Sequence, residues 1–94
     1  MKLIYKHSPT CRISAKAKEE IDNFLLGKPD GIHFEFVNVV ENRERSIEIT
    51  EKYGIKHESP QIILIDNNEK VLWYASHYQV SERNIKNEVS SIVT

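Results

Sequence analysis

The sequence predicts an α/β fold with the element order β-α-β-α-β-β-α, in which a four-stranded mixed sheet carries helices on both faces. An apolar strand pattern, an amphipathic helix pattern and a second strand follow one another, which is typical of two parallel strands joined by a right-handed crossover. Farther along, Asp66-Asn67-Asn68-Glu69 separates two strand patterns and predicts an antiparallel hairpin. With 94 residues, 39% hydrophobic and 29% charged, the chain is expected to form one domain over 1–94.

The first half of the chain predicts a strand, a helix and a strand. Leu3 to Lys6 is the first strand, and Cys11 to about Leu26 is the helix. The helix is indicated by apolar residues at every fourth position, namely Ile13, Ala17, Ile21 and Leu25. The segment Gly27–Gly31, with two glycines and a proline, ends it. Ile32 to Val40 first alternates and then becomes continuously apolar, which predicts a mostly buried strand.

The second half predicts a helix, a hairpin and a last helix. Asn42 is expected to cap a helix that runs through Tyr53, and Gly54 ends it. Gln61–Ile65 and Val71–Ala75 are the two strands of the hairpin. Ser81 is expected to cap a helix that runs to about Ile92.

Charge and composition exclude several classes of protein. The 13 Lys and Arg residues are balanced by 14 Asp and Glu residues, so the basic surplus that nonspecific nucleic-acid binding needs is absent. No apolar run approaches the roughly 20 residues of a membrane helix, and the apolar stretch at the N-terminus is too short for a signal peptide. We therefore expect a cytoplasmic protein with no nucleic-acid or membrane partner.

The single cysteine, Cys11, falls where the first strand gives way to the first helix. One cysteine excludes an intrachain disulfide and a four-cysteine zinc site. A helix N-terminus offers unpaired N–H groups and a partial positive charge, which favour the thiolate. Arg12 and Lys6 are expected to add positive charge nearby. These conditions favour a reactive thiol over the alternative, a buried inert cysteine.

Two further features bear on this cysteine. Cys11-Arg12-Ile13-Ser14 has the spacing of a Cys-x-x-Cys redox motif with serine in the second place. Serine cannot resolve a mixed disulfide, so an outside thiol must do so. Ser14 either donates a hydrogen bond to the thiolate or is an ordinary serine of the first turn. Pro60 stands immediately before a strand, a position that proline tolerates.

The four histidines do not predict a metal site. His7, His33, His57 and His77 lie far apart in the sequence and lack the paired spacing of zinc ligands. His7 lies four residues before Cys11 and is placed to influence its charge. No metal is expected.

Part of the sequence resembles thioredoxins. Tyr53-Gly54-Ile55 and Pro60-Gln61-Ile62-Ile63-Leu64-Ile65, between Asn42 and Val71, are similar to the second half of these proteins. With a cysteine at a strand-to-helix junction, the chain resembles a compact thioredoxin-like fold that lacks the extra N-terminal strand and helix.

A narrower resemblance is to the monothiol bacilliredoxins, small cytoplasmic proteins of low-GC Gram-positive bacteria. Three separated segments carry it: His7-Ser8-Pro9-Thr10-Cys11-Arg12-Ile13-Ser14, Lys56-His57-Glu58-Ser59-Pro60-Gln61 and Ser76-His77-Tyr78. The family pattern is Thr-Cys-Pro-Ile-Ser followed by Lys-His-Glu-Ser-Pro-Gln. Arg12 replaces the usual proline, which exchanges a rigid first turn for a charge.

The resemblance implies roles for individual residues. Cys11 is the catalytic nucleophile. Pro60 is a cis-proline that faces it, and the main chain of Ser59 pairs with a bound peptide or thiol. The remaining expected site residues are Thr10, Arg12 and Ser14 as support and Lys56 and His57 for substrate binding.

The implied activity is the removal of bacillithiol, or a related low-molecular-weight thiol, from mixed disulfides on cytoplasmic client proteins. A transient adduct would form on Cys11. No tightly bound cofactor is expected, and bacillithiol is the co-substrate. Its malate group carries two carboxylates, for which Arg12 and Lys56 are the first candidates.

Two other functions compete with this one. Monothiol glutaredoxins share the fold and carry a [2Fe–2S] cluster, but the sequence lacks their Cys-Gly-Phe-Ser signature. A noncatalytic thioredoxin-fold binding module would use the sheet edge or the groove at Pro60, and an unreactive thiol would favour it. Arsenate reductase of the glutaredoxin type is more remote, because the downstream arginines have no obvious counterparts.

Overall fold

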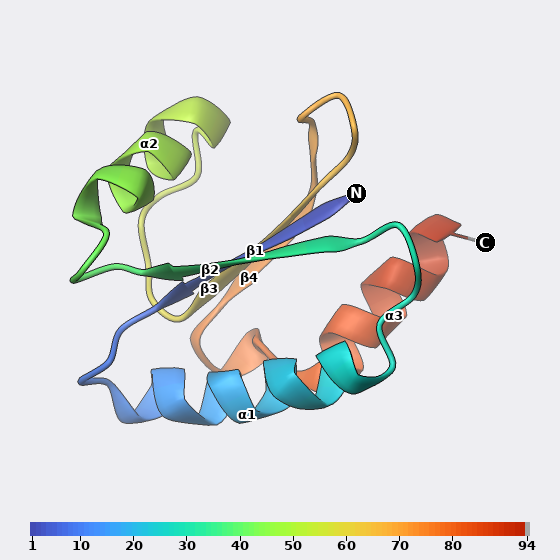
Figure 1. Ribbon diagram of the computed structural model, residues 1–94, viewed down its shortest axis with the longest axis horizontal. Coiled ribbons are helices and arrows are strands. Elements are labelled where there is room, and N and C mark those ends of the chain that lie inside the picture. The colour runs from blue at the N-terminus through green and yellow to red at the C-terminus, as the bar shows by residue number, and fades with distance from the viewer. Residues whose placement is uncertain (94) are drawn as a thin grey trace.

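A computed structural model describes residues 1–93 and confirms the predicted order of elements (Figure 1). Its helices and strands are β1 (Lys2–His7), α1 (Arg12–Leu26), β2 (His33–Asn38), α2 (Arg43–Tyr53), β3 (Gln61–Ile65), β4 (Val71–Ser76), the 3₁₀ turn η1 (His77–Gln79) and α3 (Glu82–Val93). The strands form one sheet in the order β2-β1-β3-β4. The β1–β2 pair is parallel, and the β1–β3 and β3–β4 pairs are antiparallel. Only η1 was not predicted.

Strand β1 lies in the middle of the sheet and is covered on both faces. Leu3 and Tyr5 pack with α1 and α3, whereas Ile4 packs with α2 on the other face. Figure 1 shows the same division, with α1 and α3 on one side of the sheet and α2 on the other. Because successive side chains of a strand point to opposite faces, Lys6 lies on the α2 side.

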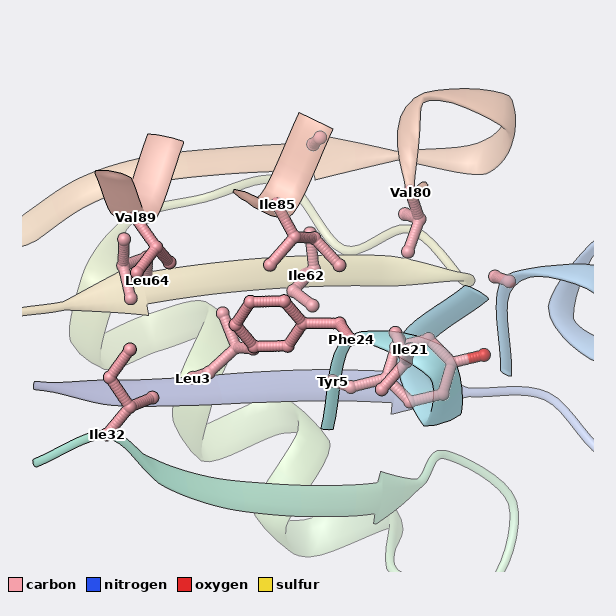
Figure 2. Packing of buried hydrophobic residues seen from close by; sticks show 12 residues of the cluster. Leu3, Tyr5, Ile21, Phe24, Ile32, Ile62, Leu64, Val80, Ile85 and Val89 are labelled. Atoms are coloured by element: carbon pink, nitrogen blue, oxygen red, sulfur yellow. The ribbon is translucent and has the colours of Figure 1, made fainter. Parts of the chain in front are cut away.

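The larger core lies between the sheet and helices α1 and α3 (Figure 2). Helix α1 buries Ala17, Ile21 and Phe24 there. The predicted stripe was partly wrong, because Ile13 and Leu25 are only half-buried. A helix turns once every 3.6 residues, so a spacing of four drifts off the buried line and Phe24 takes the place expected of Leu25.

The second strand differs most from its prediction. It ends at Asn38 rather than Val40, and of its six residues only Val37 is buried. The prediction of a mostly buried strand was wrong because β2 is an edge strand, with α2 beside only one of its faces. Val39 and Val40 instead belong to the turn that leads into α2.

Local residues set both ends of α2 and the start of α3 as predicted. The Asn42 side chain accepts a hydrogen bond from the Arg45 N–H at 3.4 Å. Gly54 ends α2 in the left-handed conformation, with φ of 66°, which glycine adopts without steric cost. The Ser81 hydroxyl accepts from the Asn84 N–H at 3.2 Å at the start of α3.

An ion-pair cluster around Glu35 connects β2 with β1 and α2. The Glu35 carboxylate accepts from Nε and Nη2 of Arg45, each at 2.8 Å. Lys2 Nζ lies 2.8 Å from the same carboxylate. Hydrogen bonds from Arg45, followed by the contribution of Lys2, lower the pKa of Glu35 to about 2.

We predict that Glu35→Gln lowers the free energy of unfolding by about 1–2 kcal/mol at neutral pH, an amount reduced by the partial exposure of the pair. The folded-state pKa lies below the ordinary value of 4.5, so this stabilisation is present above that value and is lost as the pH falls toward 2. Urea unfolding at several pH values measures it. The exposed Glu51→Gln is the control, and an equal deficit at all pH values would contradict the prediction.

Candidate functional site

The candidate site lies at the end of the sheet where β1 finishes. The chain leaves β1 at His7 and reaches Cys11, the N-cap residue of α1. Strand β3 runs antiparallel to β1 and begins at this same end, where Gln61 pairs with Lys6. Pro60 lies one residue before that pair. The register therefore brings the loop carrying Cys11 and the turn carrying Pro60 to one end of the sheet (Figure 1).

Neutral hydrogen-bond donors tune the Cys11 thiol, which is free and half-exposed. Its pKa is lowered chiefly by the Ser14 N–H. Desolvation opposes this effect, and the Ile13 N–H and the Ser14 hydroxyl add to it. The N–H groups of the first turn of α1 thus favour the thiolate, as the helix-terminus argument predicted.

Ser14 connects the cysteine loop to the helix. It is buried, and its Oγ accepts a hydrogen bond from the Ser8 N–H at 3.2 Å. Because Oγ acts as the acceptor in that bond, its own proton remains available for the Cys11 sulfur. The Ser14 side chain is the last of the contributions to the lowered Cys11 pKa, which agrees with the donor role of the two that the sequence left open.

Tyr5 holds the first turn of α1 through hydrogen bonds of its hydroxyl group. Its hydroxyl lies 3.0 Å from the Ser14 carbonyl oxygen and 2.8 Å from His7 Nδ1. A carbonyl only accepts, so the single phenolic proton goes to Ser14, and His7 Nδ1 must donate to Tyr5. Burial raises the pKa of Tyr5, which keeps the hydroxyl protonated. The sequence indicated Tyr5 as a core residue, and its hydrogen bonds to the site were missed.

Lys6 does not supply charge to Cys11, and that expectation was wrong. Its side chain is 0% exposed, and its ammonium donates to Thr50 Oγ1 at 2.8 Å and to His57 Nδ1 at 3.2 Å. Strand alternation turns Lys6 toward α2, whereas Cys11 begins the helix on the opposite face. The neighbouring Arg12 is exposed and is not among the groups that lower the Cys11 pKa.

The turn before β3 presents unpaired main chain. The Ser59–Pro60 peptide bond is cis, as expected. The Pro60 carbonyl accepts from the His77 N–H at 2.8 Å, which connects the turn to η1, and Gln61 Nε2 donates to the Lys56 carbonyl at 3.0 Å. Within residues 1–93, the N–H and C=O groups of Ser59 have no hydrogen-bond partner. They are free to pair with a bound chain.

The expected site residues therefore divide into two groups. Ser14 helps to lower the pKa of the cysteine, and the turn of Ser59 and Pro60 lies at the same end of the sheet. The side chains of the other expected residues, Thr10, Arg12, Lys56 and His57, are exposed. Of these four, only His57 has a side-chain hydrogen bond in the described part of the chain.

The described residues contain neither a membrane-spanning helix nor a cluster of metal-ligating side chains. None of the described helices combines the length and apolar character that crossing a membrane requires. Among the described residues, no three His, Cys, Asp or Glu side chains gather in a way that suits a metal ion.

Solved structures with similar backbones define the class as the thioredoxin fold. A candidate oxidoreductase with a thioredoxin fold is 28% identical with a TM-score of 0.84, over 94% of this chain and 76% of that one. Thioredoxin 1 of Thermosipho africanus is 17% identical with a TM-score of 0.77, over 99% and 94% of the two chains. Thioredoxin-2 of the malaria parasite is 20% identical with the same TM-score, over 96% and 81%.

Within that class the family is specific. Residues 1–85 match the family model of the monothiol bacilliredoxin BrxC. The chain belongs to the monothiol bacilliredoxin family, which implies a thiol redox role of the bacilliredoxin type.

We predict that Ser14→Ala raises the pKa of Cys11 but leaves it below the ordinary thiol value, because the backbone donors of Ser14 and Ile13 remain. Thiolate absorbance during a pH titration measures the change. Ser91→Ala is the control, since Ser91 is an exposed serine of α3, outside the site. An unchanged Cys11 pKa in Ser14→Ala would show that the Ser14 hydroxyl does not stabilise the thiolate.

Proposed function

We propose that the protein removes bacillithiol from mixed disulfides on client proteins by monothiol exchange through Cys11. The observation that carries this proposal is a half-exposed cysteine of lowered pKa, held by the first turn of α1, in a chain of the bacilliredoxin family. The composition is compatible with cytoplasmic clients. No tightly bound cofactor is needed, and bacillithiol is the co-substrate.

The first step is an exchange of one disulfide for another. The Cys11 thiolate attacks the bacillithiol sulfur of the mixed disulfide. The old S–S bond breaks, its electron pair goes to the client sulfur, and that thiolate takes a proton from solvent. Cys11 now carries bacillithiol. The lowered pKa of Cys11 increases the fraction of the residue that is present as the attacking thiolate.

The second step needs a thiol from outside the chain. Residue 14 is a serine, so no second cysteine can displace the adduct. A thiolate of a second bacillithiol, or of another reductase, attacks the adduct and releases Cys11 as thiolate. The new disulfide leaves with the attacking thiol. Electrons for the complete cycle therefore come from that thiol.

The turn before β3 is the proposed docking site for the mixed disulfide. The open N–H and C=O of Ser59 can pair with an extended segment, and Pro60 shapes the turn. Arg12 and Lys56, both exposed, are the proposed cations for substrate carboxylates. His57 lies beside Lys56 in the same loop.

We predict that Cys11→Ser abolishes transfer, because a hydroxyl cannot form the mixed disulfide. Intact-mass spectrometry of the protein mixed with a bacillithiolated client should show one adduct on the wild-type chain and a released client. Ser91→Ala, at an exposed position of α3, is the control and should still form the adduct. Appreciable transfer by Cys11→Ser would refute the mechanism.

The competing iron–sulfur function has its own readout. Visible absorbance after anaerobic reconstitution, lost in Cys11→Ser, would favour cluster carriage. An adduct-free wild-type chain whose Cys11 titrates at the ordinary value of about 8.5 would favour a noncatalytic module.

We predict that charge reversal at both Arg12 and Lys56 raises the apparent KM for a bacillithiolated client roughly two- to fivefold, since exposed ion pairs are weak. Steady-state transfer at low salt measures it. Reversal of Lys70 and Arg83, which are also exposed, is the control. An unchanged KM would show that Arg12 and Lys56 do not bind the substrate.

A further inference from the structure

A groove of about 480 Å³ lies beside the candidate site, on the α2 side of the sheet. Its lining residues come from the turn after β2, from α2 and from the loop before β3, and they are Val39, Val40, Arg43, Ser46, Ile47 and His57. Two observations place the groove at the same end of the sheet as the site. The Val39 N–H donates to the His7 carbonyl at 2.9 Å, and His57 lies three residues before Pro60.

Aliphatic side chains form much of the groove. Val40 is 63% exposed and Ile47 is 47% exposed, although both are apolar. Arg43 and Ile47 are four residues apart in α2 and therefore share one face of the helix. The volume lies within the range of about 300–1,000 Å³ that is typical of small-molecule sites.

The charge of the groove is positive. Arg43 is exposed and has no carboxylate partner among the described residues, and no carboxylate lines the groove. Arg45, two residues along the same helix, is by contrast fully engaged with Glu35 and Glu48. The groove therefore keeps one guanidinium free for an anionic ligand.

His57 adds a second donor whose proton position the structure assigns. The buried Lys6 ammonium can only donate, so His57 Nδ1, at 3.2 Å, must accept. The Ser46 hydroxyl lies 3.4 Å from the same nitrogen. A neutral imidazole that accepts at Nδ1 carries its proton on Nε2, and that N–H has no partner in the described part of the chain. Lys6 thus fixes His57 as a donor in the groove.

We propose that this groove binds the carboxylate-bearing part of the low-molecular-weight thiol, with Arg43 pairing with a carboxylate and His57 Nε2–H donating a hydrogen bond to it. The inference rests on the proposed function and identifies a binding site for its small substrate, with Arg43 as a specificity residue. A small acidic thiol fits both the volume and the charge, since two donors and a short aliphatic wall form one compact site.

The test compares two mixed disulfides on the same client protein. One carries bacillithiol, and the other carries 2-mercaptoethanol, which has no carboxylate. Arg43→Ala should lower kcat/KM for the bacillithiol adduct roughly tenfold, as expected for the loss of one charge-assisted contact, and leave the mercaptoethanol adduct unchanged. Arg83→Ala, which removes an exposed arginine of α3, should change neither.

His57 provides a second variant. His57→Ala should lower the preference for the bacillithiol adduct, and His57→Gln, whose amide can donate, should partly restore it. The readout is the ratio of kcat/KM for the bacillithiol adduct to kcat/KM for the mercaptoethanol adduct. A general loss of stability lowers both values and therefore cancels in the ratio.

Each outcome decides the proposal. Equal losses with both adducts in Arg43→Ala would show that the groove holds the client or only supports the fold, and would overturn the inference, as would no loss with either adduct. Both results leave the proposed function intact. A wild-type protein that transfers neither adduct contradicts the proposed function itself, and the inference with it.

Discussion

The arrangement of the site depends on the alternation of two neighbouring side chains in the central strand. Tyr5 and Lys6 are adjacent in β1, a strand covered on both faces, so they must point in opposite directions. The Tyr5 hydroxyl holds the Ser14 carbonyl in the first turn of α1, whereas the Lys6 ammonium holds His57 on the α2 side. One strand therefore positions the nucleophile and the groove beside it. A buried polar group that lost its partner here would cost free energy. This cost stabilises both the Tyr5–Ser14 and the Lys6–His57 hydrogen bonds.

The chemistry of the thiol follows from the same arrangement. Cys11 is tuned by N–H and O–H donors of Ser14 and Ile13 rather than by a neighbouring cation. Neutral donors stabilise the thiolate without placing a fixed charge against the sulfur. This leaves the cations of the region, exposed Arg12 and Arg43, free to face other groups of a substrate. In the proposed function, activation of the nucleophile and recognition of a charged substrate are thus assigned to different residues.

A single cysteine and open main chain at Ser59 define what the site can do. The turn before β3 offers unpaired N–H and C=O groups at the end of the sheet where Cys11 lies. An exchange partner can be held in an extended pose there. With a serine at residue 14, the adduct of the proposed cycle would persist until an outside thiol arrives, so the site would accept two thiols in turn.

The sequence by itself determined the features that local patterns encode. Hydrophobic periodicity and turn residues predicted the order of the elements, the Asn42 cap and the Gly54 end of α2. The junction position of Cys11 predicted a lowered pKa for its thiol. The tertiary structure alone decided which way Lys6 points, that β2 lies at a sheet edge, and that Arg43 and His57 share a groove. These outcomes depend on which segments become neighbours in space. The spacing of residues along one segment does not determine which distant segments will pack against it.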